Sequence, residues 1–199
     1  MYNLPRGYLS YSAIATWLQS PKTYRKRYYE DAPMIFTPEL TFGKKFADLL
    51  ENADDSVSHI KQYAVPEQKI NVEIDGVPIF GFIDSYDPKK KAFYEFKTGR
   101  IPWTQSRVDG HLQLDIYSLC IEEMFGRVRN ECSLIWIETE KRKEKTTGLI
   151  THEESHRIAL TGEIMEFTRK ITKKERQATR ELVVRVATDI SADYTAYLK

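Results

Sequence analysis

The chain has 199 residues, of which 41% are hydrophobic and 30% are charged, and its net charge is +1. These values fit a single globular domain with its own core, and they argue against a protein that coats DNA through a uniformly basic surface. The two cysteines argue against a disulfide framework and exclude a four-cysteine zinc or iron–sulfur site within one chain.

No apolar run approaches the ~18 residues of a membrane-spanning helix. The first residues, Met-Tyr-Asn-Leu-Pro-Arg-Gly, lack the hydrophobic core of a signal peptide. We therefore expect no membrane association and a cytoplasmic location, either in a bacterium or, for a phage protein, in its host.

Three helices are predicted in the first quarter of the chain. The first spans Leu9 to Leu18, and the second starts at Pro21 with Ser20 as its N-cap. The third spans Thr41 to Glu51. The apolar spacing predicts that these helices bury Leu9, Ile14, Trp17, Leu18, Phe42, Phe46, Leu49 and Leu50.

The pattern then changes to the alternation of β-strands. Lys69–Ile74 and Val77–Tyr86 flank the hairpin signal Asp75-Gly76, and a third strand is predicted over Ala92–Lys97. Helical spacing returns over His111–Phe125.

A fourth strand is predicted over Cys132–Glu138, and Gly148–Thr151 is a candidate to pair with it. Thr172 and Glu175 then form a capping box that opens a C-terminal helix. This order predicts an α/β fold in which helices flank a mixed central sheet. One domain covers residues 1–199, with its core at about 9–138 and a C-terminal strand and helical part at about 139–199.

The chemistry is concentrated on the second and third predicted strands. Glu95 and Lys97 are two residues apart, so they share one face of a strand. A hairpin that is symmetric about residues 89 and 90 places Asp84 opposite Glu95, with Cβ atoms only ~5 Å apart. Two such carboxylates repel unless a cation joins them, and carboxylates with the Phe96 carbonyl suit Mg²⁺ or Mn²⁺. Lys97 would then orient water or stabilise charge on a phosphate.

The alternative interpretation of these residues is structural. A Glu-x-Lys pair alone is most often a surface salt bridge on an edge strand. The joint pattern of an Asp after an apolar strand, a turn and a Glu-apolar-Lys strand favours the catalytic interpretation.

With these motifs the chain resembles the RecB-type branch of the PD-(D/E)XK nuclease superfamily, which includes CRISPR-associated nucleases and phage exonucleases. The resemblance covers about residues 9 to 138. It rests on five elements in the family's order: Ser10-Tyr11-Ser12, the helix from Phe42-Gly43 to Glu51, the strand from Phe80 to Asp84, the strand from Glu95 to Gly99, and Gln113 with Tyr117. It implies a restriction-endonuclease-like core, with Asp84, Glu95, Lys97, Gln113 and Tyr117 at the active site.

The sequence departs from the family pattern at two places. Many relatives carry a His where this chain has Ala47, four residues before Glu51. Glu51 is therefore either a replacement metal ligand or an ordinary solvated residue. Relatives with an iron–sulfur cluster begin their cysteine set with Cys-Pro, whereas this chain has Ser20-Pro21, so we expect no cluster.

Several further residues are candidates for DNA binding. Basic side chains neutralise phosphates and aromatic rings stack on unpaired bases. The candidates are Ser10, Ser12, Lys22, Arg25, Lys26, Arg27, Arg100 and Trp103. For the segment with Tyr24, Tyr28 and Tyr29, the alternative is a solvated basic face with the tyrosines packed inside. His111 has no evident partner and is excluded from the catalytic set.

The expected function is that of a Mg²⁺- or Mn²⁺-dependent deoxyribonuclease. It is expected to act as an exonuclease in recombination, repair or phage DNA processing, with DNA as substrate and a recombination or helicase protein as an additional candidate partner. The alternatives are a restriction-type endonuclease on the same fold, and a non-catalytic nuclease-like domain that binds DNA.

Overall fold

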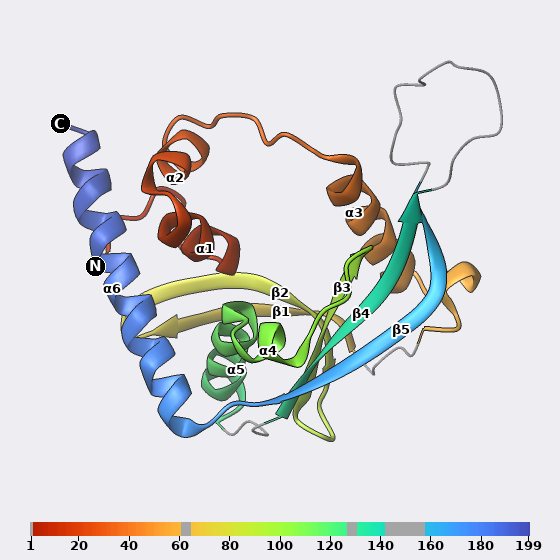
Figure 1. Cartoon of the computed structure of the whole chain (residues 1–199). Coiled ribbons are helices and arrows are strands. Elements are labelled where there is room, and N and C mark those ends of the chain that lie inside the picture. Colours follow the sequence, from red (N-terminus) through yellow and green to blue (C-terminus); the bar gives the residue numbers. More distant parts are fainter. Residues whose placement is uncertain (1, 61–64, 127–130, 142–157) are drawn as a thin grey trace, which may run out of the picture.

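A five-stranded mixed sheet forms the centre of the computed structural model, which describes residues 2–60, 65–126, 131–141 and 158–199 (Figure 1). The strands stand in chain order: β1 (Val65–Ile74), β2 (Val77–Asp87), β3 (Ala92–Gly99), β4 (Glu131–Lys141) and β5 (Ile158–Lys170). Only β3 and β4 run parallel, and the helix between them supplies the crossover that such a pair requires. The predicted fold class, an α/β fold with a mixed sheet and flanking helices, is confirmed.

Three helices precede the sheet, as predicted. They are α1 (Tyr11–Gln19), α2 (Pro21–Tyr28) and α3 (Pro38–Glu51). Ser20 caps α2 with its side-chain oxygen, and Pro21 stands in the first turn of that helix. The short helix η1 (Asp55–Val57) follows α3.

Three helices follow β3. They are α4 (Gln105–Asp109), α5 (Leu112–Phe125) and the long C-terminal helix α6 (Lys173–Tyr197). α6 opens with the predicted capping box of Thr172 and Glu175. It lies along one end of the molecule, beside α1 and α5 (Figure 1).

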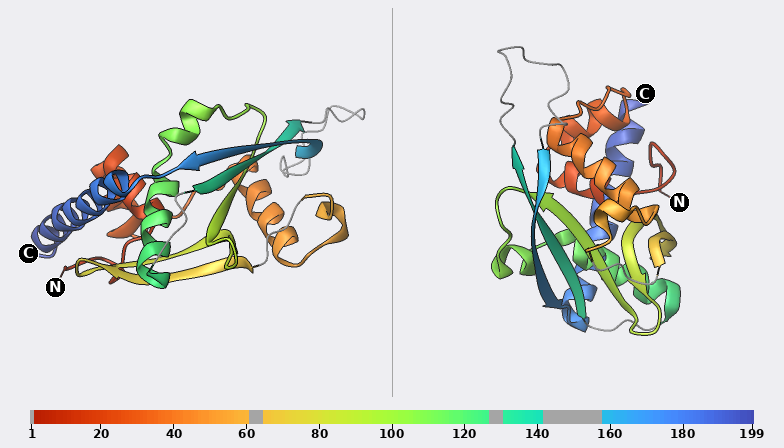
Figure 2. Two further views of the ribbon diagram at one scale, coloured as in Figure 1. Left: turned by 90° about the horizontal axis from the view of Figure 1, so that it is seen from below. Right: turned by 90° about the vertical axis from the view of Figure 1, so that its right-hand side faces the viewer.

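The sheet divides beside β3. β2 pairs with β3 only between Ser85–Asp87 and Ala92–Tyr94, whereas β1 and β2 pair over almost their whole length. The part of β2 that precedes Ser85 does not pair with β3, and there β1 and β2 diverge together from the other three strands. Helix α5 occupies the angle between the two parts of the sheet (Figure 2). The division starts at Asp84, so this residue stands where the sheet opens.

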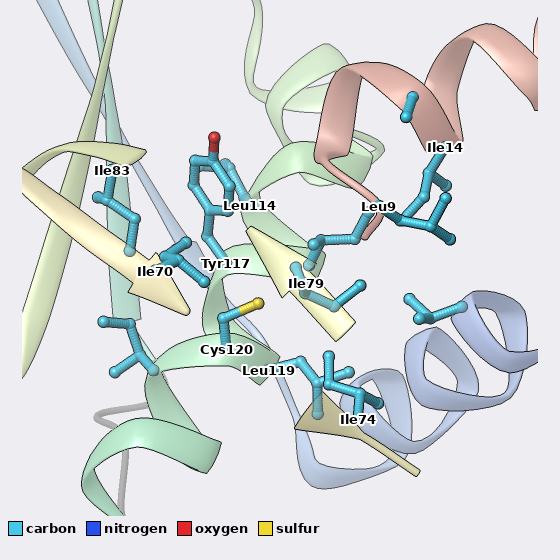
Figure 3. Close-up of a cluster of buried hydrophobic side chains, with 14 of the residues drawn as sticks. Leu9, Ile14, Ile70, Ile74, Ile79, Ile83, Leu114, Tyr117, Leu119 and Cys120 are labelled. Atoms are coloured by element: carbon cyan, nitrogen blue, oxygen red, sulfur yellow. The ribbon is translucent and has the colours of Figure 1, made fainter. Parts of the chain in front are cut away.

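Two hydrophobic clusters fill the structure. The larger one gathers α1, α2, α5, α6 and the β1–β2 hairpin around side chains such as Ile70, Ile83 and Leu114 (Figure 3). The smaller one joins Phe46 and Leu50 of α3 to the opposite face of β3 and β4. The site therefore lies between two packed layers that hold its strands from both faces.

Three details differ from the sequence predictions or add to them. Leu18 and Leu49 were predicted to be buried but are 45% and 36% exposed; on α3, Phe46 and Leu50, four residues apart, form the inward stripe instead. The strand β5 was not predicted, since it lies at the sheet edge and most of its residues are exposed. The short helix α4 was also missed. The candidate strand Gly148–Thr151 lies outside the described residues.

Within the described part of the chain, no helix is both long and apolar enough to cross a membrane.

Candidate active site

Glu95 and Lys97 project from the same face of β3, as their spacing predicts. The Lys97 ammonium lies 2.6 Å from Glu95 Oε1, and the Glu95 side chain is almost fully buried. The Lys97 side chain is 28% exposed, so its charged end reaches toward an opening. A buried pair with one accessible member differs from the edge-strand salt bridge of the alternative interpretation, in which both groups would be exposed.

Asp84 stands beside this pair at the point where the sheet opens. The β2–β3 register, in which Ser85 pairs with Tyr94, places Asp84 opposite Glu95, as predicted. The Phe96 amide donates a hydrogen bond of 2.8 Å to Asp84 Oδ2. The N–H and C=O of one strand residue face the same edge, so the Phe96 carbonyl also faces β2.

Gln113 and Tyr117 approach the pair from α5. Lys97 donates to Gln113 Oε1 at 2.9 Å, and Gln113 Nε2 donates to Glu95 Oε1 at 2.5 Å and to the Tyr117 hydroxyl at 3.3 Å. Gln113 thus holds both members of the Glu95–Lys97 pair. The four-residue spacing that suggested a shared helix face brings both side chains to the site.

The position of α5 depends on a buried arginine that the sequence analysis did not identify. Arg169 of β5 pairs with Asp115 at 2.6 Å and donates to the His111 carbonyl at 3.2 Å. These contacts fix the first turn of α5, and so the turn that carries Gln113. No sequence signal marks Arg169, because it lies in the strand that was not predicted.

Burial and like charge dominate the electrostatics of the site. Burial, together with the nearby Asp84 carboxylate, raises the pKa of Glu95 to about 8. Burial also raises the pKa of Asp84, against the opposing effect of Lys97. Burial disfavours the Lys97 ammonium, but the two carboxylates outweigh this and raise the pKa of Lys97. Two carboxyl groups therefore share one ammonium, and both resist ionisation in the absence of a further cation.

A cavity of about 610 Å³ gives access to these groups. Asp84, Glu95, Phe96 and Lys97 line it on the sheet side. α3 lines the opposite side, and its Gly43 lies close enough to β3 that a Cβ there would be 3.7 Å from Thr98 Oγ1.

The residues of the cavity fit a divalent cation. Glu95 Oε2 is buried and has no hydrogen-bond partner in the described structure, which is costly for a carboxylate. Asp84 and the Phe96 carbonyl add oxygen donors at the same edge, the type of ligand that Mg²⁺ and Mn²⁺ prefer. In the described residues, no three Asp, Glu, His or Cys side chains gather closely enough to hold an ion alone. The carbonyl and water would therefore have to complete the coordination.

Ala47 and Glu51 both line this cavity from α3. The position at which many relatives of the resembled family carry a His thus lines the same cavity as Asp84 and Glu95, but here it presents only a methyl group. Glu51 is exposed, and no cation pairs with it in the described residues.

The basic residues of α2 lie elsewhere, and none of them lines the cavity beside Glu95 and Lys97. Arg25 forms an ion pair with Asp193 of α6. Tyr24 and Tyr28 are buried and stacked at 4.4 Å, in agreement with the alternative in which the tyrosines pack inside. Lys22 and Lys26 are exposed. The Arg27 guanidinium lies 5.4 Å from the Tyr28 ring centroid.

Ser10 and Ser12 stand at the start of α1. Ser10 caps the helix by accepting from the Ala13 amide at 3.2 Å, and its hydroxyl lies 3.0 Å from that of Ser12. Neither serine lines the cavity beside Glu95 and Lys97. The contacts seen for Ser10 are those of a helix cap.

Arg100 and Trp103 line a second cavity of about 270 Å³, which adjoins the first at Glu39 and Thr98. Arg107 also lines it, with its guanidinium 3.8 Å from the centroid of Trp103. Because Arg107 covers a face of Trp103, that face is not free to stack on a base. The sequence analysis did not identify Arg107.

His111 packs against Trp103 with ring centroids 4.9 Å apart. Its Nε2 atom is buried without a partner, and burial, with the nearby Lys97, lowers its pKa to about 4. A neutral imidazole packed behind the site agrees with its exclusion from the catalytic set.

Comparisons of sequence and of structure give different results. No family model matches the chain, and no curated protein matches its sequence. Solved structures do match. A phage-related exonuclease from Haemophilus somnus 129PT superposes with a TM-score of 0.57 at 10% identity, covering 98% of this chain and 87% of that one. A proposed exonuclease from Eubacterium rectale gives a TM-score of 0.55 at 10% identity, covering 93% and 83%.

The chain therefore shares its overall fold with these two solved structures. At 10% identity this likeness concerns the fold alone. Asp84, Glu95 and Lys97 stand on the central strands of this fold, and a role for them has to be argued from their own geometry.

Proposed function

We propose that this protein is a metal-dependent deoxyribonuclease that hydrolyses phosphodiester bonds at the Asp84, Glu95 and Lys97 site. One observation carries the proposal: Glu95 is buried with one oxygen unpaired, next to a second carboxylate, a lysine and an open cavity. Most buried carboxylate oxygens are hydrogen-bonded, so an unpaired one beside a second carboxylate and an open cavity suits a metal ligand.

Each residue has a separate task in this proposal. Asp84, Glu95 and the Phe96 carbonyl would hold Mg²⁺ or Mn²⁺. A bound ion of this kind polarises the phosphodiester and lowers the pKa of a bound water. Lys97 lines the cavity, and its ammonium would orient the attacking water and stabilise charge on a phosphate bound there.

Gln113 and Tyr117 position the lysine. The Gln113 amide spans Lys97 and Glu95, and Tyr117 supports that amide in turn. These bonds hold the Lys97 side chain in one conformation. Less side-chain entropy is therefore lost when the ammonium engages a phosphate. Glu51 is proposed as a further ligand to the ion.

The exonuclease mode is the finer part of the proposal. It is supported by two solved structures with this fold, each described as an exonuclease. DNA as the substrate, a role in recombination, repair or phage DNA processing, and a recombination or helicase partner belong to the same proposal.

The direct test uses end-labelled linear duplex DNA and closed circular DNA, each incubated with Mg²⁺, Mn²⁺ or EDTA. We expect linear DNA to be degraded with either metal and to be spared in EDTA. Equal degradation in EDTA contradicts metal dependence, and efficient cutting of closed circles favours the endonuclease alternative. If the parent protein binds DNA but cuts neither substrate, the domain is non-catalytic.

We also propose that the protein carries no iron–sulfur cluster. Ser20 stands where the cluster-bearing relatives of the resembled family have their first Cys, and Cys120 and Cys132, both buried, are the only cysteines. A brown preparation with visible absorption from iron and sulfide would contradict this.

A further inference from the structure

A fourth carboxylate, that of Glu67 on β1, lies beside the proposed metal site. In the β1–β2 register Pro66 pairs with Ser85 and Gln68 with Ile83, which places Glu67 opposite Asp84. Because Asp84 is in turn opposite Glu95, the three carboxylates form a row across β1, β2 and β3. Glu67 lines the same cavity as the other two.

The backbone turns at this residue. Glu67 has a φ of 47°, in the left-handed region that residues with a Cβ adopt rarely, although it lies within a strand. Its pairing with Asp84 is missing from an otherwise regular ladder. The residue therefore departs from the regular strand at the position where the cavity begins.

The surroundings of Glu67 are acidic. Besides burial, Glu51 and Asp84 raise the pKa of Glu67, and no cation pairs with Glu67 in the part of the chain that the structure describes. Glu95, only 2% exposed, presents a buried oxygen without a partner in the same cavity. Lys97 is the cation paired with Glu95, and Lys44 also lines the cavity, so the acidic side chains of the cavity outnumber its lysines.

We propose that Glu67 is an outer-sphere partner of the divalent cation, which it contacts through a water molecule bound to that ion. It would supply the contact that Ala47 does not provide. This inference rests on the proposed function, because it needs an ion at Asp84 and Glu95. A contact through water agrees with the finding that no three carboxylates among the described residues converge on one point. It also suits Mg²⁺, which keeps several of its waters when bound to proteins.

The test is calorimetric titration of the metal-free protein with Mn²⁺ alone. Outer-sphere partners of a metal commonly contribute ~10- to 100-fold in affinity, so we expect Glu67→Gln to weaken Mn²⁺ binding by about that factor. Glu73→Gln is the matched control, because Glu73 is an exposed glutamate on the same strand that does not line the cavity. Asp84→Asn serves as the reference for loss of a direct ligand.

The outcomes separate this inference from the proposed function. If Asp84→Asn weakens Mn²⁺ binding but Glu67→Gln binds like the parent, the role of Glu67 is overturned and the metal site stands. If the parent binds no Mn²⁺, or Asp84→Asn leaves binding unchanged, the proposed site itself fails.

Thermal unfolding gives a second measurement that does not depend on activity. We expect Glu67→Gln to unfold in EDTA at the parental temperature or above, because it relieves repulsion among the carboxylates. We also expect it to gain less stability from Mn²⁺ than the parent and Glu73→Gln do. An equal Mn²⁺-induced rise in all three proteins contradicts the proposal.

Discussion

Two adjoining cavities share Glu39 and Thr98 but have opposite charge. The larger one contains Glu51, Glu67, Asp84 and Glu95 against Lys44 and Lys97. The smaller one contains Arg100, Arg107 and Lys141 against Glu39, which pairs with Lys141. Neither Arg100 nor Arg107 pairs with a carboxylate in the described residues.

This contrast suggests how a nearly neutral chain could act on a polyanion. An acidic cavity repels DNA unless cations fill it, whereas the basic cavity attracts phosphate directly. A strand that crosses from one cavity to the other would meet metal at the scissile phosphate and arginine at a neighbouring one. The net charge of +1 therefore conceals a local separation of charge.

The largest expected effect comes from breaking the acidic side. Asp84→Asn removes a proposed metal ligand, so both Mn²⁺ affinity and cleavage should fall. Metal catalysis lowers the activation barrier by several kcal/mol, and losing ~4 kcal/mol of this stabilisation slows the reaction ~10³-fold. Titration calorimetry and a cleavage assay measure the two quantities. Asp189→Asn on the exposed face of α6 is the control, and a metal affinity equal in both variants argues against this role for Asp84.

The acidic cavity should also make metal binding depend on pH. With a pKa of about 8 in the metal-free protein, Glu95 is mostly protonated at neutral pH and must lose its proton to bind an ion. The apparent Mn²⁺ affinity should therefore rise with pH, by up to ~10-fold per unit below pH 8, and level off above it. Titrations in buffers with different ionisation enthalpies would detect the released proton. An affinity that does not change between pH 6 and 8 contradicts this account.

The basic cavity should affect DNA binding more than chemistry. In an Arg100→Ala, Arg107→Ala double variant we expect DNA affinity to fall by about 10-fold, with a salt dependence reduced by ~1.4 to 1.8 in log–log slope for two lost phosphate contacts. The rate at saturating DNA should remain close to parental. Fluorescence anisotropy at several salt concentrations measures this.

The matched control for the basic cavity is a Lys22→Ala, Lys26→Ala double variant, which removes two exposed charges from α2. If this variant loses more DNA affinity than the Arg100→Ala, Arg107→Ala variant, DNA binds along α2 and not at the second cavity.

The smallest effects are expected on α3. Ala47→His adds an imidazole that faces the carboxylates, and we expect it to tighten Mn²⁺ binding several-fold, within the ~10-fold range of a supporting ligand. Glu51→Gln should weaken binding by a similar factor if Glu51 contributes to the ion. An unchanged affinity in Glu51→Gln would return that residue to an ordinary solvated position.

The central strands were predictable because their signals are local. The opposition of Asp84 to Glu95 followed from counting residues across one turn, and the shared face of Glu95 and Lys97 followed from strand alternation. The capping box at Thr172 was likewise contained within four residues.

Other parts of the site depend on long-range packing, and sequence patterns do not report it. Glu67 reaches the cavity only because β1 pairs with β2 in one particular register and its backbone turns there. Arg169 acts on α5 from an edge strand whose exposed residues give no clear period. Arg107 lies on a helix too short to be recognised from its periodicity. Each of these residues became visible only when the tertiary contacts were known.

The most direct test of the central claim is the single-turnover cleavage rate of Lys97→Ala on labelled linear DNA with Mn²⁺. If Lys97 stabilises the reacting phosphate, the variant should bind metal and DNA almost as well as the parent but cleave ~10²–10³-fold more slowly. A salt bridge without a catalytic role contributes at most ~1 kcal/mol to stability, and its loss would leave the rate almost intact. A folded Lys97→Ala protein that cleaves at a near-parental rate would therefore contradict the account.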